Sequence, residues 1–413
     1  MKRGLGRVVA VLVMLAFVVV ADAPRAVAYE ALPGVKLVAE GDPNSELWAV
    51  ACPATTQCTA ADGAARVITF NPHAVGSPAP VRLPVSDLIL RLACPSTTQC
   101  TGVTMVSGEE VTFNPQSPLP TISVRSIASE TLEDVSCPSL TQCTATGYRS
   151  GKEITFNPQS GATINENVII GTGNLLGNIS CPSLTQCTTV AVPSGSEGNG
   201  PGTTIVTFDP LSPAHSSHVG VQRMRASAVA CPSVDLCTVI DGNPGSEAAF
   251  NPTVSGKPGL VHLGVGASDV ACPTTEQCTA VGLGTETTFT PGVPNTATKS
   301  AFMPGPFLSV QSRAVSCPTT TQCTAVGSHD EEVTFNPGPP LPAPPSKCLV
   351  PRVGKNETLS QIEAAMRRNH CTVGRVRRVR DHRHRRGSVI AVSPRPLSRL
   401  PAGAPVSVTL SRG

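Results

Sequence analysis

Short apolar segments alternate with polar turns along most of this chain, and the alternation itself repeats. Between residues 29 and 337, an apolar segment, the pattern Cys-Pro-x4-Cys, a second apolar segment, a polar turn and a third apolar segment follow one another seven times, at intervals of 41 to 50 residues. The third segment is of the type Val-Thr-Phe-Asn-Pro (111–115), and a fourth, such as Val-Arg-Leu (81–83), precedes the next unit. Segments this short, rich in Val and Thr and bounded by turn residues, predict β-strands.

Four short strands in about 44 residues is the length of one propeller blade. The seven units therefore predict a mainly β fold, a seven-bladed β-propeller over residues 29–337. No fourth segment follows the seventh unit, but Val-Lys-Leu-Val at 35–38 resembles one. We expect 35–38 to complete the last blade and close the ring, which protects the edge strands. An open β-solenoid is the alternative; it needs no permuted strand, and its repeats are usually shorter.

Three repeated positions have a predicted structural role. Phe ends the third segment of every unit, which predicts a large side chain between the sheets: Phe70, Phe113, Phe156, Phe208, Phe250, Phe289 and Phe335. The following Asn-Pro or Asp-Pro predicts a turn; a repeated Asn ligand is the alternative, which Thr290 in one unit disfavours. Gln precedes the second cysteine in six units, with Leu236 in the other. We expect its amide to bond the turn backbone, or the glutamines to line one face.

The cysteine pattern predicts one disulfide in each unit. Antiparallel neighbours joined by a tight turn lie within the Cα distance that a disulfide requires. A zinc site needs four ligands, and a redox motif has a different spacing, so both alternatives are disfavoured and no metal or cofactor is expected. The predicted pairs are Cys52–Cys58, Cys94–Cys100, Cys137–Cys143, Cys181–Cys187, Cys231–Cys237, Cys272–Cys278 and Cys317–Cys323.

The N-terminus predicts export. Lys2, Arg3 and Arg7 precede an apolar run of about fourteen residues, and Ala-Val-Ala at 26–28 offers a cleavage site, as in a signal peptide. We therefore assign 1–28 to a signal peptide. An uncleaved anchor is the alternative, although the run is shorter than the ~20 residues of a spanning helix. Export to an oxidising compartment agrees with disulfide formation.

The repeated units resemble secreted actinobacterial-type repeat proteins with C-P-S-x-x-x-C-x-A-V-G units. The resemblance covers residues of about 30 to 340. It implies a propeller architecture and no agreed function.

A second, smaller domain follows a Pro-rich linker at 338–347. Thr358 and Gln361 form a capping box for a helix, and Leu359, Ile362 and Met366 fall on one face of it. Three segments of period 2 come next. Cys348 and Cys371, the two cysteines left over, are predicted to pair.

Residues 348–413 resemble a PASTA domain over nearly its whole usual length. The matching segments, in order, are Cys-Leu-Val-Pro (348–351), the helix at 358–369, Cys-Thr-Val-Gly (371–374), 389–396, Leu-Pro-Ala-Gly (400–403) and 406–410. The resemblance implies recognition of peptidoglycan fragments, or a role as a spacer.

The charge is divided unevenly between the two domains. Residues 348–413 hold fourteen basic and three acidic residues, a net of +11, whereas 29–347 has a net of −11. We expect the two parts to meet different partners. A cluster at 375–386 is predicted to be either a solvated hairpin or a surface for acidic wall polymers and wall-peptide carboxylates. Its arginines are Arg375, Arg377, Arg378, Arg380, Arg383, Arg385 and Arg386, accompanied by His382 and His384.

These features predict a non-catalytic envelope protein, secreted to the cell wall or cell surface. The C-terminal domain is expected to bind peptidoglycan or an anionic wall polymer, and the propeller an unknown protein or small ligand. A secreted hydrolase or lyase is an alternative, which the lack of a Ser/His/Asp arrangement or metal-ligand cluster disfavours. Another is a carbohydrate-binding propeller, which the scarcity of Trp and Tyr disfavours. Export and the lack of stacking aromatics exclude nucleic acid.

Overall fold

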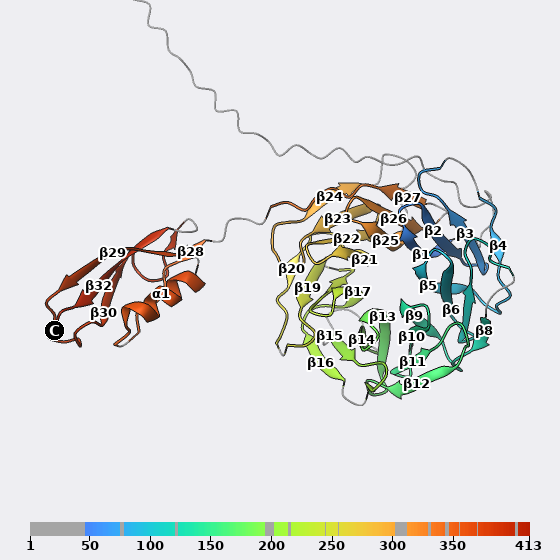
Figure 1. Ribbon diagram of the computed structural model, residues 1–413, viewed down its shortest axis with the longest axis horizontal. Coiled ribbons are helices and arrows are strands. Elements are labelled where there is room, and N and C mark those ends of the chain that lie inside the picture. The colour runs from blue at the N-terminus through green and yellow to red at the C-terminus, as the bar shows by residue number, and fades with distance from the viewer. Residues whose placement is uncertain are drawn as a thin grey trace, which may run out of the picture.

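The computed structural model describes residues 46–413 apart from 75–77, 120–122, 195–201, 214–215, 244, 255, 302–311, 329–331, 343–346, 355, 370 and 401–403. Seven antiparallel sheets form a ring around a central opening, and a small separate domain follows (Figure 1). No helix in the described residues is long and apolar enough to cross a membrane. The predicted signal peptide and the predicted closing strand at 35–38 lie outside the described residues.

Each sheet is one blade, and its strands follow one another in sequence from the channel outward. The innermost strands are β1 (Leu47–Ala54), β5 (Ile89–Ser96), β9 (Leu132–Ser139), β13 (Asn174–Ser183), β17 (Ala226–Ser233), β21 (Ala267–Thr274) and β25 (Ser312–Thr319). The second strands are β2 (Gln57–Asp62), β6 (Gln99–Thr104), β10 (Gln142–Gly147), β14 (Gln186–Pro193), β18 (Leu236–Asp241), β22 (Gln277–Gly282) and β26 (Gln322–Gly327).

The third and fourth strands complete the blades. The third strands are β3 (Arg66–Phe70), β7 (Glu109–Phe113), β11 (Lys152–Phe156), β15 (Thr203–Phe208), β19 (Ser246–Phe250), β23 (Thr285–Phe289) and β27 (Glu332–Phe335). Six blades have a described outer strand, namely β4 (Val81–Arg82), β8 (Ser123–Ser126), β12 (Thr163–Val168), β16 (Ser217–Val221), β20 (Val261–His262) and β24 (Thr298–Ala301). The seventh sheet has three strands within the described residues.

The first and seventh blades close the ring directly. Strand β1 packs against β25 as each innermost strand packs against the next. The Cys52 amide donates to Ser316 Oγ at 3.0 Å, and Leu47 and Val50 share an apolar cluster with Ala314 of the seventh blade. These contacts exclude the open solenoid.

The repeated phenylalanines fill the space between neighbouring sheets, as predicted. Phe113 is fully buried and shares one cluster with Ala61 and Val67 of the first blade and Ile89 of its own. The Asn-Pro turns are also confirmed: Asn71 Oδ1 accepts a hydrogen bond from the His73 amide at 3.0 Å, and the same contact recurs in most other units. The Asn therefore serves the turn.

All eight predicted disulfides are present. In each blade the bond links the end of the innermost strand to the start of the second strand, across the Cys-Pro-x4-Cys turn. Cys348 and Cys371 form the eighth, in the C-terminal domain. So many disulfides indicate an oxidising, extracytoplasmic environment.

The glutamine before the second cysteine connects one blade to the next. Gln142 Nε2 donates to the Leu184 carbonyl at 2.7 Å, in the disulfide turn of the following blade. The other five glutamines make the same bond, including Gln322 to Thr55 across the ring closure, at 2.7 to 3.0 Å. The expected bond to turn backbone is present, but the turn belongs to the neighbouring blade. Leu236 leaves one junction of the ring without this bond.

We predict that removing this interblade hydrogen bond destabilises the propeller and that adding it at Leu236 stabilises the propeller. Replacing Gln142 by Leu, the residue found at position 236, leaves the Leu184 carbonyl without its donor and should destabilise the propeller by about 1–2 kcal/mol. The reciprocal Leu236→Gln supplies the missing donor and should stabilise it by about 1 kcal/mol or less. Urea unfolding of the oxidised protein measures both. Identical midpoints for wild type and both variants would show that the glutamines contribute no net stability.

Buried glutamates form a second repeated feature, inside the blades. Glu153 Oε2 accepts from Thr155 Oγ1 at 2.7 Å, and Thr155 shares a 2.9 Å hydrogen bond with Thr144, which follows the second cysteine. Related networks surround Glu110, Glu247, Glu286 and Glu332, all buried three residues before the repeated Phe. Burial raises the pKa of Glu153 and Glu286 to about 7 and that of Glu247 to about 6, against the opposing effect of the threonine hydroxyls.

These raised pKa values predict a propeller that is more stable in mild acid than in mild base. The pKa of Glu153 rises on folding from about 4.3 to about 7. Such a group stabilises the folded state most at a pH below its unfolded pKa. Its contribution is lost as the pH rises through the higher value.

Glu153→Gln should therefore stabilise the protein by roughly 1–3 kcal/mol at pH 8 and change little at pH 4.5, because Gln carries no charge to desolvate. Glu276→Gln, in an exposed turn, is the matched control and should leave the pH profile unchanged. Thermal unfolding from pH 4.5 to 8 measures both. A Glu153→Gln profile parallel to wild type would contradict the prediction.

The C-terminal domain combines one helix with two small sheets. Its elements are β28 (Cys348–Leu349), α1 (Leu359–Arg368), β29 (Thr372–Val379), β30 (Val389–Ser393), β31 (Arg399–Leu400) and β32 (Pro405–Ser411). Strand β32 lies between β29 and β30, and β28 pairs with β31. The capping box is confirmed, because the Thr358 amide donates to Gln361 Oε1 at 2.8 Å and the Gln361 amide to Thr358 Oγ1 at 3.4 Å. The predicted helix face packs on the sheet through Ile362 and Met366.

The described part of the Pro-rich linker begins on the propeller surface. The Leu341 amide donates to the Thr296 carbonyl of the sixth blade at 2.8 Å. The first half of the segment is thus held to the propeller.

Candidate functional sites

The innermost strand of every blade contains a β-bulge at one repeat position. Leu47 pairs with Asp62 and Ala49 with Ala61, so Trp48 has no partner on β2. The register shifts at the same place in the other blades, four residues before the first cysteine. We name the residues at this position the bulge ring: Trp48, Leu90, Glu133, Gly177, Ser227, Ser268 and Arg313. A bulge re-aims a side chain.

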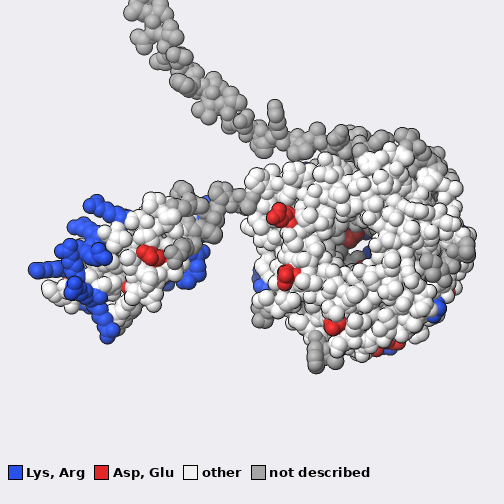
Figure 2. Space-filling view, in the orientation of Figure 1, with Lys and Arg blue, Asp and Glu red and all other residues white. Residues whose placement is uncertain are grey.

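Five members of the bulge ring line a cavity of about 280 Å³. They belong to the sixth, seventh, first, second and third blades, which are consecutive around the ring, so the cavity lies in the central channel. Charged side chains are visible within the opening in Figure 2. The full lining is Trp48, Leu90, Arg91, Met105, Glu133, Ser268, Ser312 and Arg313.

One side of the cavity is an aromatic–cation pair. The Arg313 guanidinium lies over the Trp48 ring, 3.8 Å from its centroid, and donates to Glu46 at 2.7 Å. Its Nε is buried and has no hydrogen-bond partner. Arg313 thus joins the seventh blade to the first while one of its donors is left unused.

The other side combines Arg91 with acidic groups. Asp134 accepts hydrogen bonds from the Ile179 and Val135 amides and so joins two blades. Glu133 has no hydrogen-bond partner in the described residues. Burial raises the pKa of Glu133 to about 7; the positive charge of Arg91 opposes this rise and Asp134 adds to it. Burial likewise raises the pKa of Asp134 to about 6, again against Arg91.

The predicted arginine cluster occupies one strand and one loop. Arg375, Arg377 and Arg378 lie on β29, an edge strand, and Arg380 follows it. Arg383, Arg385 and Arg386 lie in the connection to β30. The expectation of a hairpin is wrong, because β32 separates β29 from β30 and pairs with both. The structure nevertheless brings the basic side chains together at one end of the domain (Figure 2).

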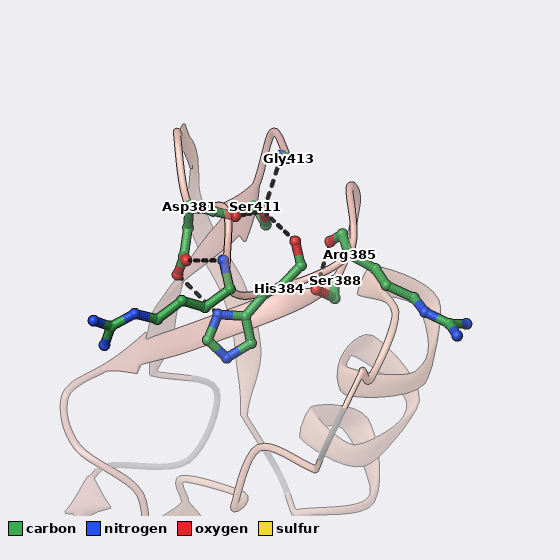
Figure 3. A network of polar contacts seen from close by, with 7 residues as sticks. Asp381, His384, Arg385, Ser388, Ser411 and Gly413 are labelled. Carbon is green, nitrogen blue, oxygen red and sulfur yellow. Dashed lines mark hydrogen bonds and ion pairs between the residues drawn. The ribbon is translucent and has the colours of Figure 1, made fainter.

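The loop that carries the last three arginines has a defined shape (Figure 3). Asp381 accepts from the Arg383 amide at 2.9 Å and from His384 Nδ1 at 2.8 Å. Ser411 Oγ donates to the Asp381 and His384 carbonyls at 3.0 and 3.1 Å. The hydrogen bond from the Arg383 amide has the largest effect in lowering the pKa of Asp381, followed by the one from His384. The carboxylate is therefore ionised and can accept both hydrogen bonds.

All seven arginines are exposed. In the part of this domain that the structure describes, none of their guanidinium groups pairs with a carboxylate. Their charge is therefore available to an anion from solution. No group of His, Cys, Asp or Glu side chains suited to a metal ion occurs in the described residues.

Comparison with solved structures identifies the architecture of the repeats. A structure described as RRP9 WD40 repeats matches with a TM-score of 0.59 at 10% identity, over 74% of this chain and 99% of that one. A structure of U3-55K matches with a TM-score of 0.57 at 11% identity, over 75% and 98%. The fold is that of a WD40-type β-propeller. At such low identity the match carries the fold alone.

No protein-family model and no curated protein matches the chain. The resemblance of residues 348–413 to PASTA domains is therefore not confirmed, and the structure shows a small α+β domain. The WD40-type fold places the bulge ring in the channel, a site that the sequence reasoning did not find.

We predict that Arg313 stabilises the ring closure. Arg313→Ala removes the contact with Trp48 and the ion pair with Glu46, and should cost about 1–2 kcal/mol. It should also change the emission of Trp48, the only tryptophan of the chain. Arg225→Ala, an exposed arginine just before β17, is the control. Equal stability and equal emission for Arg313→Ala and wild type would show that the stacked pair contributes nothing.

Proposed function

We propose that this chain is a secreted, non-catalytic envelope protein. Its C-terminal domain binds peptidoglycan or an anionic wall polymer, and its propeller is an interaction scaffold. The observation that carries the proposal is the set of seven exposed arginines whose guanidinium groups are unpaired in the described domain.

Electrostatics supports a polyanionic partner. The domain has a net charge of +11, and its arginines project from an edge strand and a loop fixed by Asp381 and Ser411. Arginine binds phosphate and carboxylate in a bidentate manner. A loop whose backbone is held in place presents several such groups at once, at a lower entropic cost than a mobile loop would have.

Two further observations support an extracellular partner. The eight disulfides point to an oxidising environment, and the sequence of residues 1–28 has the features of a signal peptide. The resemblance of residues 348–413 to PASTA domains points to the same class of partner. On this proposal the domain retains the propeller at the wall or cell surface.

The experiment is co-sedimentation of the mature chain with purified cell wall at low and high salt. Arg377, Arg380 and Arg383 changed together to Ser should reduce binding roughly tenfold at low salt, because each lost contact weakens the attraction. Arg352, Arg395 and Arg399 changed to Ser remove the same charge from elsewhere in the domain and are the matched control. Binding of the wild type should fall steeply with added salt, since exposed charges are screened.

Walls stripped of their anionic polymers identify the partner. Retained binding to stripped wall with little salt dependence would assign the domain to peptidoglycan instead of the polymer. Equal losses for both triple variants would show that net charge matters and the array does not. Failure of the wild type to sediment with any wall preparation would overturn the proposal.

A further inference from the structure

The bulge ring varies in chemistry, whereas the two residues that precede each first cysteine hardly vary. The residue two before the first cysteine is always Val, Leu or Ile, and the residue just before it is always Ala or Ser. The bulge position holds Trp, Leu, Glu, Gly, Ser, Ser and Arg in turn. Folding of the repeat therefore does not dictate these side chains. Five of the seven line one cavity.

Two charged residues, Arg91 and Glu133, line this cavity without forming an ion pair with each other. Arg91 acts electrostatically on Glu133, yet no ion pair within 4.0 Å joins them in the described residues. Arg91 instead donates to the Leu90 carbonyl at 3.1 Å. The Glu133 carboxylate has no hydrogen bond in the described residues, although its side chain is half-buried. An unpaired carboxylate at such a site favours a ligand that completes its hydrogen bonds.

Apolar side chains complete the lining. Leu90 is buried, whereas Met105 is 37% exposed at the cavity and Trp48 is partly exposed. A cavity of about 280 Å³ is at the small end of ligand sites. Its size suits one or two amino-acid residues and is too small for an oligosaccharide or a folded partner.

We propose that the channel cavity binds a small zwitterion, an amino acid or dipeptide with an apolar side chain. The adjacent ammonium and carboxylate of such a ligand fit between Glu133 and Arg91, so that each charge meets its opposite. The apolar side chain packs on Leu90, Met105 and the exposed part of Trp48. This site is independent of the arginine surface of the C-terminal domain.

Trp48 makes the proposal directly testable, because its emission reports on this cavity alone. The mature protein is titrated with the natural L-amino acids except tryptophan, and with apolar dipeptides, at concentrations up to the millimolar range. Calorimetry is the second readout. At least one apolar probe should give a saturable change. Its N-acetyl and amide derivatives, which lack one charge each, should bind at least roughly tenfold more weakly.

Variants separate the charged contact from the cavity. Glu133→Gln should weaken binding of the best probe roughly tenfold and should leave binding of its N-acetyl derivative unchanged. Ser268→Leu fills the cavity and should abolish binding of every probe. Glu276→Gln, in an exposed turn, is the matched control and should bind as the wild type does.

The wild-type titrations decide the question even if Ser268→Leu does not fold. Absence of any response by fluorescence and by calorimetry across the panel would overturn the proposal. A derivative that binds as tightly as its parent zwitterion would overturn it too, because the paired charges would then have no part in binding.

Discussion

The ring depends on the turn that each disulfide closes. The two cysteines are only six positions apart in the sequence, so the loss of chain entropy in the unfolded state is modest, and the main effect of the disulfide is to fix the position of the turn. The closed turn holds a carbonyl such as that of Leu184 where Gln142 of the preceding blade reaches it. With 3% aromatic residues in the chain, the blades have few large side chains with which to hold one another. A short covalent loop and a polar link between blades take over part of that task.

The interior of this propeller holds many polar and acidic side chains, so its net charge does not describe its surface. The excess of acidic residues in 29–347 suggested an acidic surface. Much of it is instead inside: Glu110, Glu153, Glu247 and Glu286 are buried in hydrogen bonds with threonines. The face shown in Figure 2 carries few acidic side chains. On the face shown in Figure 2, the C-terminal domain is strongly basic and the propeller carries few charged side chains.

Features set by local sequence could be predicted, and those set by neighbouring blades could not. The cysteine pairs, the Asn71-type turns and the capping box of Thr358 each involve residues a few positions apart, and all are present. The acceptor of Gln142 lies 42 residues away, so the sequence indicated a turn but not which one. The arginine cluster was predicted, but the alternative that it forms a hairpin is wrong. Strand β32, which comes last in the chain, lies between β29 and β30. The bulge at Trp48 leaves the apolar pattern of the strand unchanged and gave no periodic signal.

The bulge gives one residue per blade freedom from the pairing that constrains its neighbours. Seven such positions, one from each repeat, surround a common axis. Most of these residues could be exchanged by mutation without disturbing a disulfide or a turn, whereas Arg313 and Ser227 also join neighbouring blades. Recognition in the channel could therefore change while the frame of the blades stays the same, as with binding loops on a rigid scaffold.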